Sequence, residues 1–217
     1  MCKNGDVPHP SNRARILTAA IETLARDPDA SIGDIAKAAR VVRRTVYGHF
    51  ENRHALISGI ADQVAGDVAA SVPDAADLPE DPALALAFFT LVTWPVGNRY
   101  RLLLEVARKE LGEQRILELL EPARQPTLAI IEDGQARGVF SSYLPASSLV
   151  ALSDAATMTI VHEANKGTIT NPGQALAIIS LVQAGIDLPT STETVTRAVE
   201  LVARQDPHDD AANSPVR

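Results

Sequence analysis

Hydrophobic residues recur three and four positions apart along most of this chain, the spacing that gives an α-helix one apolar face. The first such pattern predicts a helix over residues 11–26. Asp27-Pro28-Asp29 should end it, because proline disfavours helical geometry in the residue before it. Two shorter patterns follow within residues 31–50. We expect these three helices to pack together as one small core.

The longer C-terminal part shows the same periodicity, interrupted by proline, glycine and aspartate. Pro95-Val96-Gly97 should end one helix, and Asn98 should cap the next. Pro122 and Pro126 should kink or split another. The expected helices span residues 54–71, 82–94, 99–111, 113–136, 146–165, 171–185 and 191–204. No pair of strands is evident, so the predicted fold class is all-α with about nine or ten helices.

The stretch from Ser31 to Phe50 carries the clearest local signals. Ser31 can cap a helix, and an acidic residue three positions later, Asp34, supports that cap. The apolar face of this first helix is Ile32, Ile35, Ala36 and Ala39. A second apolar set, Val42, Val46 and Phe50, predicts a second helix that buries this face. Its other face carries Arg43, Arg44, Thr45, Tyr47 and His49. Two short helices of this kind, joined by a tight turn, are typical of a helix-turn-helix.

The run Thr45-Val46-Tyr47-Gly48-His49-Phe50, followed by residues 51–56, resembles the signature of TetR-type transcriptional regulators. The resemblance implies a DNA-binding helix-turn-helix domain over residues 1–53, with its motif at about 31–50. It also implies a helical-bundle domain for ligand binding and dimerisation over residues 54–205. We expect the polar tail, residues 206–217, to be disordered, and residues 1–10 to form a mobile arm.

Two residues depart from the family pattern. Arg40 stands in the turn where the family has glycine, and a positive φ angle there would cost arginine about 1 kcal/mol. Alternatively, Arg40 adopts ordinary helical or bridge geometry and the turn differs slightly. Val42 stands where the family has a serine or threonine cap, whose loss typically costs about 1 kcal/mol.

The DNA-contacting residues predicted for the head are Arg43, Arg44, Thr45, Tyr47, His49 and Arg53. Arg43 and Arg44 begin the recognition helix, so either could read guanine or simply bind phosphate. The resemblance implies phosphate contacts for the other four. Arg13 and Arg15 lie in the first turn of the first helix, where they either reach the DNA backbone or remain solvated charges.

Charge distribution agrees with a DNA-binding head. The chain has a net charge of −7, yet residues 1–60 carry nine lysines and arginines against six acidic residues. A basic end on an acidic body presents one surface to phosphates. The single cysteine, Cys2, excludes an internal disulfide framework and a multi-cysteine metal site. The sequence shows no signal peptide and no apolar run long enough to span a bilayer, which favours a cytoplasmic protein.

The body should provide a dimer interface and a ligand site. The helices at 146–165 and 171–185 are apolar over a wide arc, and the family dimerises through two such helices. Candidates for contact with an effector, expected to be lipophilic, are Phe88, Phe89, Trp94, Tyr100, Leu103, Phe140, Met158 and His162. Each could instead be an ordinary core residue, or an interface residue in the case of His162.

The resulting hypothesis is a ligand-responsive repressor that binds a palindromic operator as a homodimer, without cofactor or metal. A second possibility is a helical ligand-binding protein that has lost tight DNA binding. A third is a small all-α enzyme, although no nucleophile, phosphate-loop or paired-histidine motif is present. Asp154 and His162 could share one helix face, which is too little to indicate catalysis.

Overall fold

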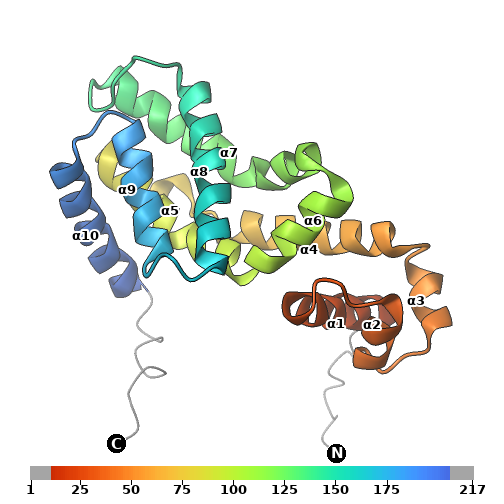
Figure 1. Cartoon of the computed structure of the whole chain (residues 1–217). Helices are drawn as coiled ribbons and strands as arrows, with labels where there is room; N and C mark the ends of the chain where they lie inside the picture. Colours follow the sequence, from red (N-terminus) through yellow and green to blue (C-terminus); the bar gives the residue numbers. More distant parts are fainter. Residues whose placement is uncertain (1–10, 206–217) are drawn as a thin grey trace, which may run out of the picture. The chain divides into compact units, whose positions relative to one another are not determined.

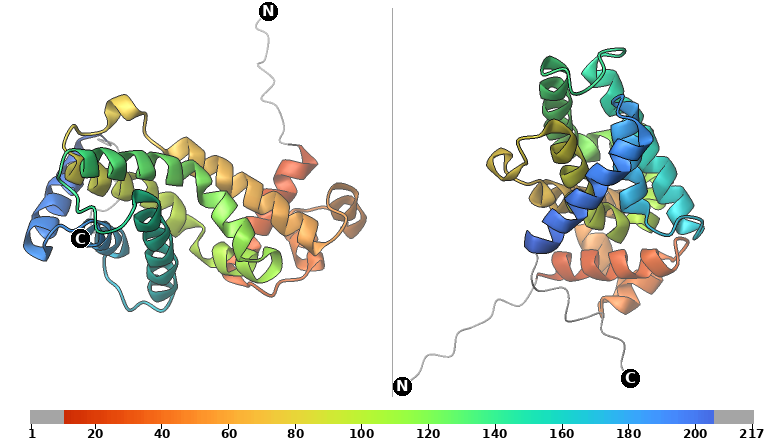
Figure 2. Two further views of the ribbon diagram at one scale, coloured as in Figure 1. Left: turned by 90° about the horizontal axis from the view of Figure 1, so that it is seen from above. Right: turned by 90° about the vertical axis from the view of Figure 1, so that its left-hand side faces the viewer.

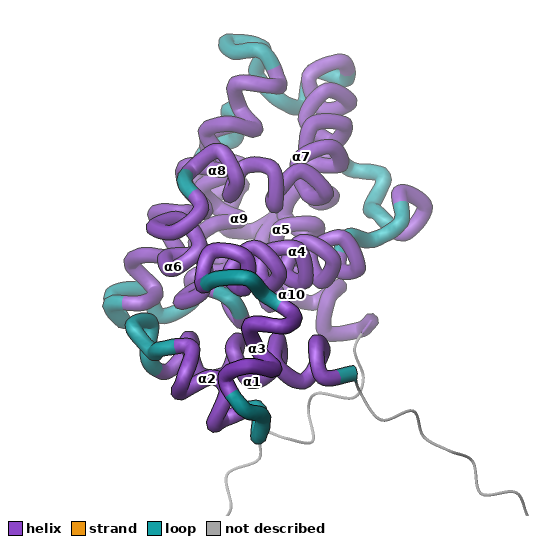
Figure 3. Tube along the Cα trace, turned by 90° about the vertical axis from the view of Figure 1, so that its right-hand side faces the viewer, coloured by secondary structure: helices purple, strands orange, loops and turns teal. Residues whose placement is uncertain are grey.

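A computed structural model of the protein describes residues 11–205. The predicted mobile arm at 1–10 and the predicted tail at 206–217 lie outside these residues. The described part contains α-helices, one short 3₁₀ helix and no strand (Figure 3), which confirms the all-α prediction. The helices are α1 (Asn12–Arg26), α2 (Ile32–Ala38), α3 (Arg43–His49), α4 (Arg53–Ser71), η1 (Ala75–Asp77), α5 (Pro82–Arg99), α6 (Arg101–Leu111), α7 (Glu113–Ala136), α8 (Ala146–Asn165), α9 (Pro172–Gln183) and α10 (Leu188–Gln205) (Figure 1).

The chain folds into two compact units. One, called here the head unit, takes the N-terminal residues up to Val64 together with Leu102–Leu119. The other, the body unit, takes Ala65–Arg101 and the residues from Leu120 onward. Helices α4 and α7 therefore each contribute residues to both units. These units are defined by contacts within the chain, whereas the predicted boundary between residues 53 and 54 divides it by function and stays a prediction.

The head unit is built on the three helices predicted for it. Helix α1 packs against α2 and α3, and α2 packs against α3. Ser11 caps α1 by accepting a hydrogen bond from the Ala14 N–H. The centre of the core is fully buried and consists of Ile16, Leu24, Ile35, Val46 and Leu56. Because each helix is short, this shared apolar core stabilises them more than their own hydrogen bonds can.

The core of the body unit forms around α5. This helix packs against α9 and α10, which also pack against each other, and α8 lies along α9 (Figure 2). Residues 82–89 of α5 are buried all round, which explains why their sequence is almost continuously apolar. Phe140 closes one end of the core, packed so tightly on Gly134 that a Cβ there would collide with its ring.

Proline affects helix boundaries less than the sequence predicts. Helix α5 continues through Pro95 to Arg99, so Pro95 does not end it and Asn98 lies inside the helix. Helix α7 likewise continues through Pro122 and Pro126 without splitting. An interior proline costs about 3 kcal/mol. The contacts of α5 with two neighbouring helices outweigh such a cost, and they are invisible in a local sequence pattern.

Candidate nucleic-acid interface and body cavity

Helix α2 begins with a complete capping box. The Ser31 hydroxyl accepts a hydrogen bond from the Asp34 N–H at 3.3 Å, and the Asp34 carboxylate accepts one from the Ser31 N–H at 2.9 Å. The Ser31 hydroxyl also donates to the same carboxylate at 2.6 Å. The hydrogen bonds from the Ser31 side chain and backbone lower the pKa of Asp34 below its ordinary value. The sequence-based prediction of this cap is confirmed.

The turn that follows α2 places Arg40 in the left-handed region, with φ of 55°. Among the described residues, no other non-glycine residue has a positive φ. The Val41 N–H donates to the Ala36 carbonyl, and the Arg40 N–H donates to the Lys37 carbonyl. These two bonds form a Schellman motif, in which glycine is the usual residue at the left-handed position. The strained alternative is therefore the one that the structure adopts.

Helix α3 begins without a side-chain cap. Its N-cap residue, Val42, has extended geometry and makes no capping hydrogen bond. The expectation that Val42 is buried with Val46 and Phe50 is wrong, since its side chain is 68% exposed while theirs are at most 4% exposed. Val42 lies at the N-cap, before the first helical turn, where the four-residue periodicity of the helix does not yet apply.

The outer face of α3 presents most of the predicted DNA contacts to solvent. Arg44 and His49 are exposed, Tyr47 is 52% exposed, and Thr45 is half-buried. Arg43 is exposed as well, but its guanidinium lies against Gly33 of α2, where a Cβ would collide with it. Arg43 and Arg44 look equivalent in sequence, but in the structure only Arg43 is seen against α2. These residues remain predicted contacts.

Arg53 is the sixth predicted DNA contact, and it has partners within the head unit. Its Nη1 donates to the Ala30 carbonyl at 2.5 Å and its Nη2 to the Pro28 carbonyl at 3.0 Å. Its Nε pairs with Glu110 of α6 at 3.1 Å. Three of its five N–H groups are therefore used, and the other two are available to a phosphate.

Arg13 and Arg15 also have partners that the sequence did not indicate. The Arg13 guanidinium lies 5.4 Å from the centre of the Phe50 ring, a cation–π distance. Arg15 donates to the Ala39 carbonyl at 2.9 Å and so ties α1 to the end of α2. Both arginines help to fix the helix-turn-helix.

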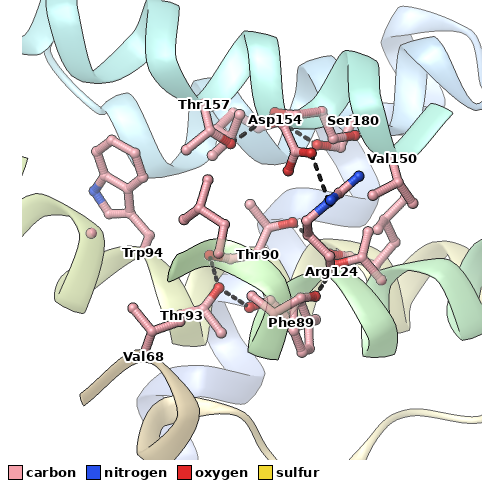
Figure 4. Close-up of a pocket in the computed structure, with 17 residues that line it drawn as sticks. Val68, Phe89, Thr90, Thr93, Trp94, Arg124, Val150, Asp154, Thr157 and Ser180 are labelled. Atoms are coloured by element: carbon pink, nitrogen blue, oxygen red, sulfur yellow. Dashed lines mark hydrogen bonds and ion pairs between the residues drawn. The ribbon is translucent and has the colours of Figure 1, made fainter. Parts of the chain in front are cut away.

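The body unit contains a cavity of about 120 Å³ between α4, α5, α7, α8 and α9. Two of the predicted ligand-contacting residues, Phe89 and Trp94, line it (Figure 4). Trp94 packs on Gly173, at the start of α9, so closely that a Cβ at that glycine would collide with the indole. Other lining residues include Val68, Leu86, Leu120, Val150 and Leu176.

The other six predicted ligand contacts are not among the residues that line this cavity. Phe88 and Phe140 are buried in the body core, and Leu103 is buried in the head unit. Tyr100 is buried and donates a short hydrogen bond to Asp67, and its pKa is raised to about 12, chiefly by burial. Met158 is half-buried and His162 is exposed. All eight stay predictions as ligand contacts.

Sequence reasoning missed the charged pair in the cavity. Arg124 of α7 and Asp154 of α8 meet there, with the Arg124 Nε 2.9 Å from an Asp154 carboxylate oxygen (Figure 4). The two residues are thirty positions apart on different helices, so no local pattern connects them.

The head has a clear counterpart among known proteins. Residues 16–60 match the sequence pattern of the family described as "Bacterial regulatory proteins, tetR family". This chain carries the DNA-binding head of the TetR family. The TetR-type signature predicted at Thr45–Phe50 is confirmed, and with it the class of function, a DNA-binding transcriptional regulator. No curated protein sequence matches the chain.

Solved structures with the same fold share little sequence identity with this chain, and some of them are described as TetR-family regulators. The fatty acid degradation regulator FadR from Bacillus halodurans is 18% identical, covers 82% of this chain and 97% of its own, and superposes with a TM-score of 0.66. FadR from Bacillus subtilis in complex with stearoyl-CoA is 18% identical, with coverage of 79% and 97% and a TM-score of 0.64. RolR in complex with resorcinol is 18% identical, with coverage of 86% and 93% and a TM-score of 0.56. The matched family is one of regulatory proteins, and both FadR neighbours are regulators.

Two further observations concern residues 11–205 only. Within that range no helix is long and apolar enough to cross a membrane. The same residues contain no group of three or more histidine, cysteine, aspartate or glutamate side chains arranged to hold a metal ion.

Proposed function

We propose that the protein is a homodimeric repressor that binds a palindromic operator through α3 and is released by a small molecule bound in the body. The observation that carries the DNA-binding part is the exposed row of Arg44, Tyr47 and His49 on α3, within the TetR-type head. A DNA partner also places the proposed activity in the cytoplasm.

The main proposed DNA contacts of the head are the four exposed or half-buried residues Arg44, Thr45, Tyr47 and His49. The Arg43 guanidinium lies against Gly33 of α2, whereas Arg44 is exposed, so Arg44 is the better candidate to reach a base edge in the major groove. The others supply hydroxyl and imidazole groups suited to phosphate oxygens. Arg43 and Arg53 also remain in the proposed set, each already held by a neighbour.

A gel shift with the DNA that flanks the gene for this protein tests the assignment. Arg44→Ala should weaken binding by about 1–3 kcal/mol if the side chain reads a base. Arg137→Ala is a matched control, because it removes an equally charged, exposed side chain that directly follows α7 in the body unit. Equal affinities for wild type and Arg44→Ala would remove Arg44 from the recognition surface.

The proposed dimer uses α8 and α9. Each of these helices exposes apolar side chains, notably Leu152 at 40% and Val182 at 43%. Ala151 and Ala155 extend the exposed apolar face of α8. One head alone offers too few contacts for specific binding, whereas two heads read half-sites about 34 Å apart. Light scattering at micromolar concentration should give twice the chain mass, and a Leu152→Arg/Val182→Arg variant should give the chain mass.

The proposed effector site is the body cavity. Helix α4 contributes residues to both compact units and supplies Val68 to the cavity wall, so occupancy can bias its position. The ligands named for structural neighbours, stearoyl-CoA and resorcinol, differ greatly in size and leave the effector class open. We keep the proposal of a partly lipophilic effector, on the basis of Phe89, Trp94 and the aliphatic lining.

The second candidate function is ligand binding without tight DNA binding. It is favoured by the strained Arg40 and the uncapped start of α3, which weaken the recognition helix. Salt dependence separates the two functions. A repressor should bind its DNA at low salt and lose affinity steeply as salt rises. A protein that binds no duplex even at low salt would support the second candidate.

A further inference from the structure

The charged pair in the cavity is only partly satisfied. The side chains of Arg124 and Asp154 are 30% and 15% exposed, so both are largely withdrawn from water. Although the Arg124 Nε and an Asp154 oxygen lie 2.9 Å apart, neither atom has a well-directed hydrogen-bond partner. The contact is thus an ion pair that leaves hydrogen-bonding capacity unused. Leaving hydrogen-bonding groups of a largely buried ion pair unsatisfied costs free energy, and a ligand that bonds to them can offset this cost.

The electrostatics of the pair leave the carboxylate under-compensated. Burial raises the pKa of Asp154, and the nearby Glu121 raises it further, while Arg124 lowers it only in part. Arg124 is itself shared, because its Nη1 bonds to Glu121 at 3.3 Å. A hydrogen-bond donor that reached the Asp154 carboxylate would therefore be stabilising.

Five of the six hydroxyl groups that line the cavity offer acceptors and not donors. Thr90, Thr93 and Thr127 each donate their proton to a backbone carbonyl of their own helix. Thr157 and Ser180 do the same on α8 and α9. Because each proton is already used, these oxygens retain only lone pairs for a ligand. Of the residues known to line the cavity, Arg124 is the one charged donor, so acceptors predominate.

The cavity is small and its remaining wall is apolar. Its volume is about 120 Å³, and an apolar cavity of about 150 Å³ in another protein accepts benzene. A single six-membered ring is comparable in size to this space, whereas a long acyl chain would have to extend beyond it. Phe89, Trp94 and the neighbouring leucines provide flat and aliphatic surface for such a ring.

We propose that the cavity binds a neutral, single-ring molecule with a hydroxyl group, and that the hydroxyl donates to Asp154 while the ring packs on Phe89 and Trp94. This inference rests on the proposed function in treating the cavity as the effector site. The Arg124 guanidinium and the Asp154 carboxylate lie side by side in the cavity, so a charged ligand of either sign would meet a like charge. An anion would meet the Asp154 carboxylate, and a cation would meet the Arg124 guanidinium.

A panel of one-ring probes tests the proposal on the wild-type protein. Trp94 is the only tryptophan in the chain and lines the cavity, so its fluorescence reports binding directly. Phenol should bind about tenfold more tightly than anisole, which has the same ring but no donor. Benzoate, benzylamine and decanoate should bind more weakly than phenol. The proposal is overturned if any of these four binds as tightly as phenol, or if phenol leaves Trp94 unaffected.

Substitutions at the pair should change the preferred charge. Asp154→Asn removes the carboxylate charge from the cavity and leaves Arg124 paired with Glu121 alone, so phenol should bind about tenfold more weakly and benzoate severalfold more tightly. Asp133→Asn, which breaks the exposed pair between Asp133 of α7 and Arg137 just after that helix, should change neither affinity. Unchanged phenol binding in a folded Asp154→Asn protein would contradict the proposed contact. Because the probe panel uses wild type, a variant that does not fold leaves the test intact.

A gel shift separates this inference from the proposed function. Phenol binding at Trp94 together with release of the DNA supports both. If phenol binds and the DNA stays bound, the ligand class holds and the effector role of the cavity falls. If the DNA is bound but no hydroxylated ring affects Trp94, the ligand class is wrong and the DNA-binding function stands.

Discussion

Helices α2 and α3 have the same length, seven residues, and form one motif, yet they begin in opposite ways. Helix α2 starts at a serine and an aspartate that satisfy each other's backbone N–H groups. Helix α3 starts at an exposed valine with no side-chain cap and follows a strained arginine. The first helix is stabilised by its own sequence, and the second is held in place by what packs against it. The helix predicted to read DNA, α3, is therefore the one that depends on tertiary contacts.

The largest expected effect comes from removing the packing that holds α3. Phe50 is 4% exposed, its ring packs on Gly59, and the Arg13 guanidinium lies over it. Phe50→Ala should lower the free energy of unfolding by about 3–5 kcal/mol, because it removes buried area and leaves a cavity. Urea denaturation followed by circular dichroism measures this. A loss below about 1 kcal/mol would mean that α3 does not depend on this contact.

Relieving the strained turn should have a smaller effect of opposite sign. Arg40→Gly places the residue favoured for left-handed geometry at the C′ position of the Schellman motif. We expect a gain of about 1 kcal/mol in unfolding free energy, seen as a higher midpoint in the same denaturation. Arg26→Gly on the exposed last turn of α1 is the contrasting control and should destabilise. No gain at Arg40 would indicate that its side chain makes a compensating contact.

Adding the missing cap should stabilise α3 by a similar or slightly smaller amount. Val42 already has the extended geometry of an N-cap and buries little surface, so Val42→Ser gains a hydroxyl acceptor at little cost. The expected gain is about 0.5–1 kcal/mol. Ser31→Ala at the start of α2 should cost a comparable amount. Thermal melting of both variants would contradict the comparison if the two shifts had the same sign.

The smallest effect concerns pH. The folded pKa of Asp34 is lowered by its hydrogen bonds to Ser31, so its contribution is present above the unfolded pKa and is lost as pH falls through the folded value. Helix α2 should therefore weaken in acid, whereas α3, which has no acidic cap, lacks this dependence. Comparing the free energies of unfolding of wild type and Asp34→Asn at neutral pH and at pH about 3 isolates the contribution of the Asp34 carboxylate. If the difference in unfolding free energy between the two proteins does not shrink in acid, Asp34 makes no such pH-dependent contribution.

The sequence alone determined features that depend on neighbouring residues. The capping box at Ser31 and Asp34 and the missing cap at Val42 follow from residues within three or four positions, whereas for Arg40 the sequence offered two geometries and the structure decided between them. Such features are readable because backbone hydrogen bonds at helix ends are local. Helical periodicity gave most of the elements for the same reason, including α8 with both of its bounds.

Only the tertiary structure decided where distant groups meet. It kept α5 helical through Pro95 by packing it between α9 and α10, and it placed Trp94 on Gly173. It also brought Arg124 to Asp154 and laid Arg43 over Gly33, so that Arg44 became the freer of the two arginines. Burial and pairing depend on which helix faces meet, and that information is spread over the whole chain.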